Sequence, residues 1–135
     1  MIRYELEKQL MDGSLAITDL PAAWDDLYEK YLGVRPANVA EGVLQDIHWS
    51  QGSIGYFPSY ALGNAYGAQI AHRMAEDMDI DALLEQGNVS VITDWLHEHI
   101  HRFGAVYDAR DLLMKVTGED FKPKYYFEYL QKKFG

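Results

Sequence analysis

The chain has 135 residues, a formal net charge of −9 at pH 7, 48% hydrophobic residues and no cysteine. Its acidic balance argues against nucleic acid and anionic membranes as partners, because both bind basic patches. No run approaches the roughly 20 apolar residues needed to cross a bilayer, and the N-terminus lacks the apolar stretch of a signal peptide. These features favour a cytoplasmic protein, and the length predicts a single helical domain over residues 1–135.

Apolar residues recur at helical spacing along the chain, and no segment keeps the alternation of a strand for long. Glycine, proline and capping residues, such as Thr18 or Asp19 for the second helix and Asp108 for the sixth, set the ends of the segments. The expected helices are residues 2–12, 19–32, 57–78, 80–86, 90–103, 109–116 and 123–134. A loop is expected over 34–40 and a short helix or turn over 41–48. The fold class is therefore all-α, with six or seven helices. Four polar residues of the first helix are expected to form a solvated face: Glu5, Glu7, Lys8 and Asp12.

The stretch 42–60 carries the densest group of chemically useful side chains. The string GVLQDIHW at 42–49 is followed by GYFPSY at 55–60. Loops set on a rigid scaffold are where binding and catalytic side chains collect. Donors such as histidine and tyrosine stabilise the negative charge that develops in a transition state. This stretch is therefore where candidate binding and catalytic residues are expected.

A second motif, the sequence HEHIH at 97–101, matches H-E-x-x-H literally. In a zinc protease two such histidines share a helix and bind the metal, and the glutamate activates water. At about 100° per residue, His97 and His101 lie about 140° and 180° from Ile92, away from the apolar stripe of this helix. A catalytic metal site needs a walled cleft, so we interpret Asp94, His97 and His101 as an exposed cluster that binds metal weakly at most.

GVLQDIHW resembles the GxxQDxHW signature of the carboxypeptidase Taq family of metal-dependent carboxypeptidases. The residues from Arg3 to Gly135 are similar to the C-terminal part of such an enzyme. The resemblance implies the helical part of a zincin-like metallocarboxypeptidase, which releases C-terminal amino acids from peptides, uses zinc or cobalt and is commonly a homodimer. The family's own HExxH lies upstream of the signature, in sequence that this chain does not contain. We therefore expect a fragment, from a truncated reading frame or an excised piece, which binds no metal and is inactive alone.

The resemblance also implies roles for single residues. His48 and Tyr56 would stabilise the oxyanion of the attacked carbonyl, and Tyr56 opens a YFPSY string similar to the YFxSF-like segment of related helical dipeptidases. Four further residues are expected on the substrate side, with Tyr60 contacting substrate, Gln45 and Asp46 orienting the loop or His48, and Trp49 forming a wall.

Two alternatives remain beside the fragment hypothesis. One is a non-catalytic helical interaction module, which binds peptides or docks with a separately encoded N-terminal half. The other is an autonomous minimal zinc protease using His97, Glu98 and His101. A fragment should expose apolar surface and self-associate, so a homo-oligomer is expected.

Overall fold

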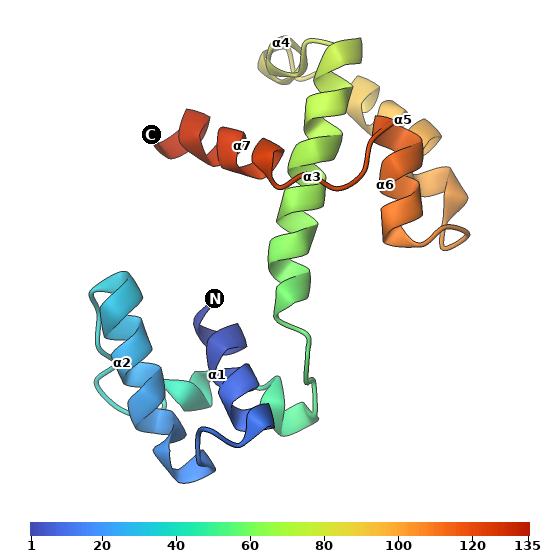
Figure 1. The fold of residues 1–135 in the computed structure, drawn as a ribbon. Coiled ribbons are helices and arrows are strands. Elements are labelled where there is room, and N and C mark those ends of the chain that lie inside the picture. Colours follow the sequence, from blue (N-terminus) through green and yellow to red (C-terminus); the bar gives the residue numbers. More distant parts are fainter. The chain divides into compact units, whose positions relative to one another are not determined.

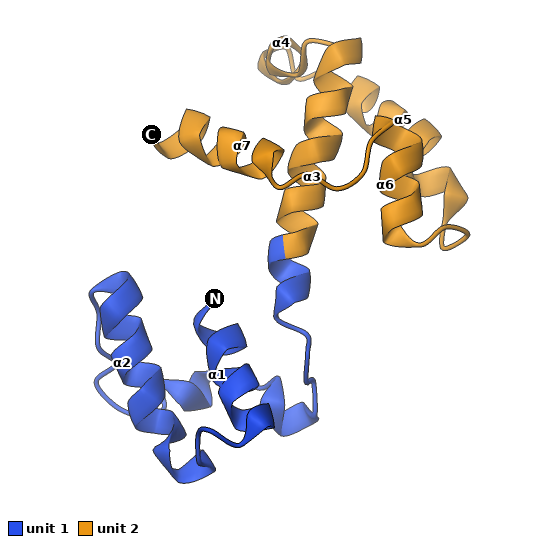
Figure 2. Cartoon of the chain, viewed as in Figure 1, with its two compact units in different colours: residues 1–61 blue, residues 62–135 orange.

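The computed structural model describes residues 1–135 and contains no strand (Figure 1). Its seven α-helices are α1 (Ile2–Asp12), α2 (Leu20–Leu32), α3 (Pro58–Asp77), α4 (Ile80–Glu85), α5 (Val89–His99), α6 (Ala109–Thr117) and α7 (Lys124–Phe134). The predicted all-α class is therefore confirmed. The chain divides into two compact units, Met1–Ala61 and Leu62–Gly135, with the boundary in the first turns of α3 (Figure 2). None of the helices combines the length and apolar character that a membrane span requires.

The core of the first unit is built around Trp24 of α2. Trp24 and Leu6 of α1 are fully buried, and Ile2 and Val43 complete the cluster. Tyr28 lies one helical turn beyond Trp24 and stacks on its ring, with 5.1 Å between centroids. Because the loop residue Val43 shares a core with two helices, packing holds the loop beside α1 and α2.

The core of the second unit joins α3, α5 and α6. Met74, Trp95 and Val116 are its buried members, one from each of these helices. The Trp95 indole Nε1 donates a hydrogen bond to Asp77 Oδ2 at 2.8 Å, so the buried ring keeps a polar partner at the end of α3.

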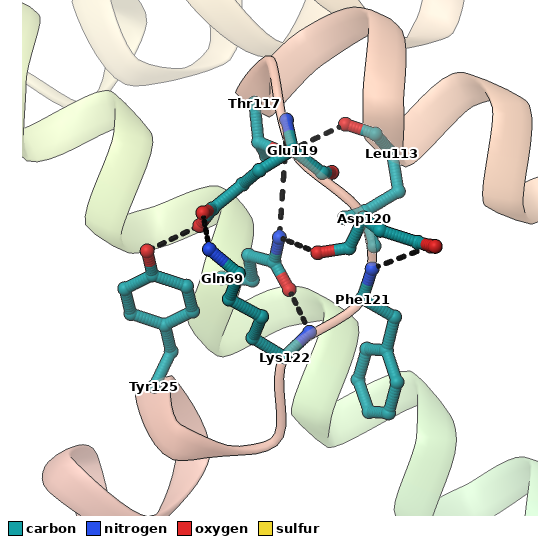
Figure 3. Close-up of polar contacts among 8 residues, drawn as sticks. All are labelled: Gln69, Leu113, Thr117, Glu119, Asp120, Phe121, Lys122 and Tyr125. Atoms are coloured by element: carbon teal, nitrogen blue, oxygen red, sulfur yellow. Dashed lines mark hydrogen bonds and ion pairs between the residues drawn. The ribbon is translucent and has the colours of Figure 1, made fainter.

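A buried glutamine connects α3 to the segment between α6 and α7 (Figure 3). Gln69 is 1% exposed, and its amide nitrogen donates to the Asp120 carbonyl at 3.0 Å and to Thr117 Oγ1 at 3.3 Å. Its amide oxygen accepts from the Lys122 backbone N–H at 2.9 Å. Both ends of the amide are thus satisfied inside the protein, as burial of a polar side chain requires.

The fifth helix is shorter than predicted. The sequence predicts one helix over 90–103, but α5 ends at His99 and a separate 3-10 helix covers His101–Phe103. At Ile100 the backbone turns to φ −131° and ψ −64°, and its side chain packs against the second unit's core. The His99 ring stacks on Trp95 at 4.1 Å, and its Nδ1 lies 2.9 Å from the Trp95 carbonyl oxygen. Tertiary packing and a side-chain bond at the last turn therefore override the helical periodicity.

Candidate functional site

The candidate site lies in the first unit, on the loop between α2 and α3. Two short 3-10 helices, Val43–Gln45 and Trp49–Gln51, interrupt this loop. Gly52 and Gly55 follow with φ of 76° and 75°, a left-handed conformation that glycine adopts without steric penalty. These turns carry the chain from His48 to the first residues of α3.

A chain of polar contacts runs through the site. The Arg3 Nε of α1 donates to Asp46 Oδ2, and Asp46 Oδ1 contacts the His48 ring at Nδ1. On the opposite side of the ring, His48 Nε2 lies 3.2 Å from the Tyr60 hydroxyl of α3. Asp46 is the most buried member, with a side chain 9% exposed, compared with 26% for His48.

This arrangement defines the tautomer of His48. A carboxylate can only accept hydrogen bonds, so the proton of a neutral His48 ring lies on Nδ1, facing Asp46. Nε2 then accepts from the Tyr60 hydroxyl. A protonated ring donates from both nitrogens, so Nε2 can present a donor to a ligand oxygen.

Three aromatic side chains surround the His48 ring. Tyr56 stacks on it with centroids 5.4 Å apart and planes 24° apart. Phe57 lies tilted at 5.0 Å, and Tyr60 meets the ring edge-on at 6.1 Å. The imidazole is thus held by aromatic packing as well as by hydrogen bonds.

The polar chain opens onto a cavity of about 390 Å³. The residues that line it are Met1, Arg3, Asp46, His48, Phe57, Tyr60 and Ala61. Tyr56, although stacked on His48, is about half exposed and does not line this cavity. A polar cluster on an apolar wall is the usual character of a small-molecule or peptide site.

Two groups of the site have shifted pKa values. Burial alone raises the pKa of Asp46, but the hydrogen bonds from His48 and Arg3 outweigh burial and lower the pKa to about 2. Burial and the neighbouring Tyr56 hydroxyl raise the pKa of Tyr60. At neutral pH, therefore, Asp46 is a carboxylate and Tyr60 keeps its proton as a hydrogen-bond donor.

The structure brings together four of the six residues singled out in the loop, namely Asp46, His48, Tyr56 and Tyr60. The other two lie elsewhere. The Gln45 amide is 3.5 Å from the Tyr28 hydroxyl, and Trp49 packs edge-on against the buried Trp24 at 6.2 Å. Neither lines the cavity.

Two charged residues of α1 were missed by the sequence reasoning. Arg3 lines the cavity and binds Asp46. Glu7 was predicted to lie on a solvated face, which is wrong, because it is 5% exposed. Its carboxylate accepts from Trp49 Nε1 at 2.8 Å and from the Gly55 backbone N–H at 2.7 Å. The only available signal was their spacing of four residues, which places both on one face of α1.

The HExxH-like motif does not form a helical zinc site. His97 is on α5, whereas His101 begins the 3-10 helix beyond the turn at Ile100. His97, His101 and Asp94 are all exposed. No three or more His, Cys, Asp or Glu residues of the chain are grouped so that they could hold a metal ion. The residues of this chain therefore do not fit a metal centre.

Solved structures of metallocarboxypeptidases contain this fold. The structure of the Pyrococcus furiosus carboxypeptidase matches 99% of the chain with a TM-score of 0.91 at 38% identity. Metallocarboxypeptidase 1 of Trypanosoma cruzi matches 98% of it, with a TM-score of 0.91 at 34% identity. In both cases the match covers 27% of the solved chain. The chain therefore has the fold of a helical segment of a metallocarboxypeptidase.

The sequence comparisons define the family. The model of the carboxypeptidase Taq (M32) metallopeptidases matches residues 1–134, and the chain belongs to this family. Carboxypeptidase 1 of Bacillus subtilis (strain 168) is 44% identical over 135 residues, which cover 99% of the chain and 27% of the relative. The chain therefore spans about a quarter of the length of its relatives, and the resemblance predicted from GVLQDIHW is confirmed.

Proposed function

We propose that this chain forms one wall of the substrate cleft of an M32 metallocarboxypeptidase, an enzyme that releases C-terminal amino acids from peptides. The observation that carries the proposal is the hydrogen-bonded chain Asp46–His48–Tyr60, whose three members line an open cavity. The zinc or cobalt of the complete enzyme is held by residues that this chain does not contain. Alone, the chain has no carboxypeptidase activity.

The proposed role of the site is to stabilise charge on the substrate. When a peptide carbonyl is attacked, its oxygen becomes negative, and preorganised donors near that oxygen lower the barrier. Because Nδ1 of His48 is engaged by Asp46, Nε2 is the ring nitrogen that faces the cavity, and it donates to a substrate oxygen when the ring is protonated. The Tyr60 hydroxyl, with its raised pKa, remains a proton donor, and it can turn from Nε2 to a ligand oxygen. Tyr56, stacked on the ring, presents a second hydroxyl from the loop that precedes α3.

Exposed apolar side chains of the same loop support a cleft shared with another part of the enzyme. Four of them are exposed without a covering element: Leu44, Ile47, Ile54 and Tyr56. Such a group of exposed apolar residues is typical of a surface that another protein segment or a ligand covers.

The proposal can be tested with a chimera, in which this chain replaces the matching segment of the Bacillus subtilis carboxypeptidase 1. Hydrolysis of an N-blocked dipeptide is measured for the chimera and for the isolated chain, both with added Zn²⁺ or Co²⁺. We expect turnover by the chimera and none by the isolated chain. A folded but inactive chimera would contradict the proposal. So would metal-dependent turnover by the isolated chain that His97→Ala abolishes, since that result would identify the minimal protease.

A further inference from the structure

Helix α1 contacts the site loop at two points through residues one helical turn apart. Arg3 binds Asp46 just before His48. Glu7 binds the Trp49 indole just after His48, and also the Gly55 backbone N–H at 2.7 Å. The loop is therefore attached to α1 on both sides of His48, although more than 40 residues of sequence separate the two residues of each contact.

The position of Arg3 is itself well defined. Its guanidinium lies 5.0 Å from the centroid of the fully buried Trp24 ring and 5.8 Å from that of Phe57. Cation–π contacts of this kind stabilise a guanidinium over a ring. Since Trp24 belongs to the core, Arg3 is fixed to the rigid part of the first unit, and its Nε is directed at Asp46.

The two carboxylate oxygens of Asp46 contact different partners. Oδ2 accepts from Arg3, whereas Oδ1 faces His48 Nδ1 and also accepts from the His48 backbone N–H at 3.2 Å. An aspartate side chain rotates easily about its terminal bond. The bond to Oδ2 therefore sets which way Oδ1 points.

We propose that Arg3 is a positioning residue for His48. Acting through Asp46, it keeps the proton of the neutral ring on Nδ1 and leaves Nε2 toward Tyr60 and the cavity. The catalytic consequence rests on the proposed function of His48, but the structural consequence does not. An outer partner that orients a histidine in this way commonly controls which ring nitrogen is available for chemistry.

The experiment is a long-range ¹H–¹⁵N spectrum of the isolated chain at a pH where His48 is neutral, which reports the ring nitrogen that carries the proton. Comparison with His48→Gln assigns the signal among the five histidines. We expect an Nδ1–H ring in the unsubstituted chain and loss of that preference in Arg3→Met. Arg3→Lys, which keeps the cation but lacks Nε, should fall between the two and carries the test if Arg3→Met does not fold.

Arg35→Met is the matched control, because Arg35 lies in the same unit and also pairs with carboxylates, those of Asp26 and Glu29, but does not touch Asp46. It should leave the His48 signal unchanged. An unchanged signal in folded Arg3 variants, or an equal change in Arg35→Met, would overturn the proposal.

The chimera supplies an independent readout. Arg3→Met should lower kcat on the order of tenfold with little change in KM, because a slightly misplaced donor weakens only the transition state. In an Asp46→Asn background the same substitution should have no further effect, since Arg3 acts through Asp46. If the two substitutions instead lower kcat additively, Arg3 does not act through Asp46. Full activity of a His48→Gln chimera would instead refute the proposed function and leave the tautomer result standing.

Discussion

Each of the two units contains a polar cluster built on a buried side chain, and the clusters differ in one respect. In the second unit the amide of Gln69 is satisfied at both ends by Thr117, Asp120 and Lys122 (Figure 3). In the first unit the chain from Asp46 through His48 to Tyr60 borders a cavity. Gln69 also lines a smaller cavity, of about 230 Å³, but its amide nitrogen already donates to Thr117 and Asp120 and its oxygen already accepts from Lys122. We call this satisfied group the closed cluster and the group of Asp46, His48 and Tyr60 the open cluster. The comparison therefore separates a structural polar group from a candidate site, although both are partly buried.

The open cluster depends on the hydrophobic core around Trp24, and we expect the largest loss of stability from a substitution in that core. Trp24→Ala removes a fully buried ring that contacts Tyr28, Trp49 and Arg3. We expect a loss of about 3–5 kcal/mol in the free energy of unfolding, measured by urea titration. Phe127→Ala, at a position 65% exposed, is the control and should have little effect. A loss below about 1 kcal/mol for Trp24→Ala would show that the first unit is not packed around this ring.

Acid should weaken the open cluster. The pKa of Asp46 is about 2 in the folded chain, against an ordinary value of 3.8. Because the folded value is lowered, the ionised form contributes on the order of 2 kcal/mol above pH 4, and this contribution is lost as pH falls toward 2. The measurement is the difference in unfolding free energy between the unsubstituted chain and Asp46→Asn from pH 6 to pH 2. A difference that does not shrink in that window would contradict the assignment.

A substitution in the closed cluster should change the free energy of unfolding and leave the His48 site unchanged. Gln69→Leu leaves the Lys122 N–H and the Asp120 carbonyl without their partner, which should lower the unfolding free energy by about 1–3 kcal/mol. The spectrum of His48 should stay as it is. Gln131→Leu, at an exposed position on α7, is the matched control and should be nearly neutral. A changed His48 spectrum in folded Gln69→Leu would remove the distinction between the two clusters.

The smallest effect is expected from an exposed ion pair. Arg102 lies 2.7 Å from Glu98 with both side chains more than half exposed. Arg102→Gln should change the unfolding free energy by no more than about 0.5 kcal/mol, and high salt should abolish the difference. A larger, salt-independent loss would mean that exposure is a poor guide to which pairs matter in this chain.

Much of the fold was predictable because its signals are local. Helical periodicity gave the all-α class, and residues such as Gly13 and Gly33 marked helix ends that the structure confirms. The break after His99 was not predictable, because it depends on Ile100 entering the core and on a side-chain bond to Trp95. Periodicity describes one helix and contains no information about what packs on it.

For the candidate site, the composition of the sequence located the loop but did not identify Arg3 and Glu7, the residues of α1 that hold it in place. His48, Asp46 and the tyrosines lie within 15 residues of one another, so their meeting could be expected. Arg3 and Glu7 lie about 40 residues away on a helix that also carries solvated charges. A charged residue on a helix is usually exposed, and only the partners Asp46, Trp49 and the Gly55 N–H explain why these two are not.

The most direct test of the account is kcat of the chimera carrying His48→Gln. If His48 acts on the transition state, His48→Gln should lower kcat by about 100-fold and change KM and thermal stability little. Gln69→Leu in the same chimera should show the reverse, with lower stability and unchanged kcat. A folded His48→Gln chimera with the kcat of the unsubstituted chimera would contradict the account.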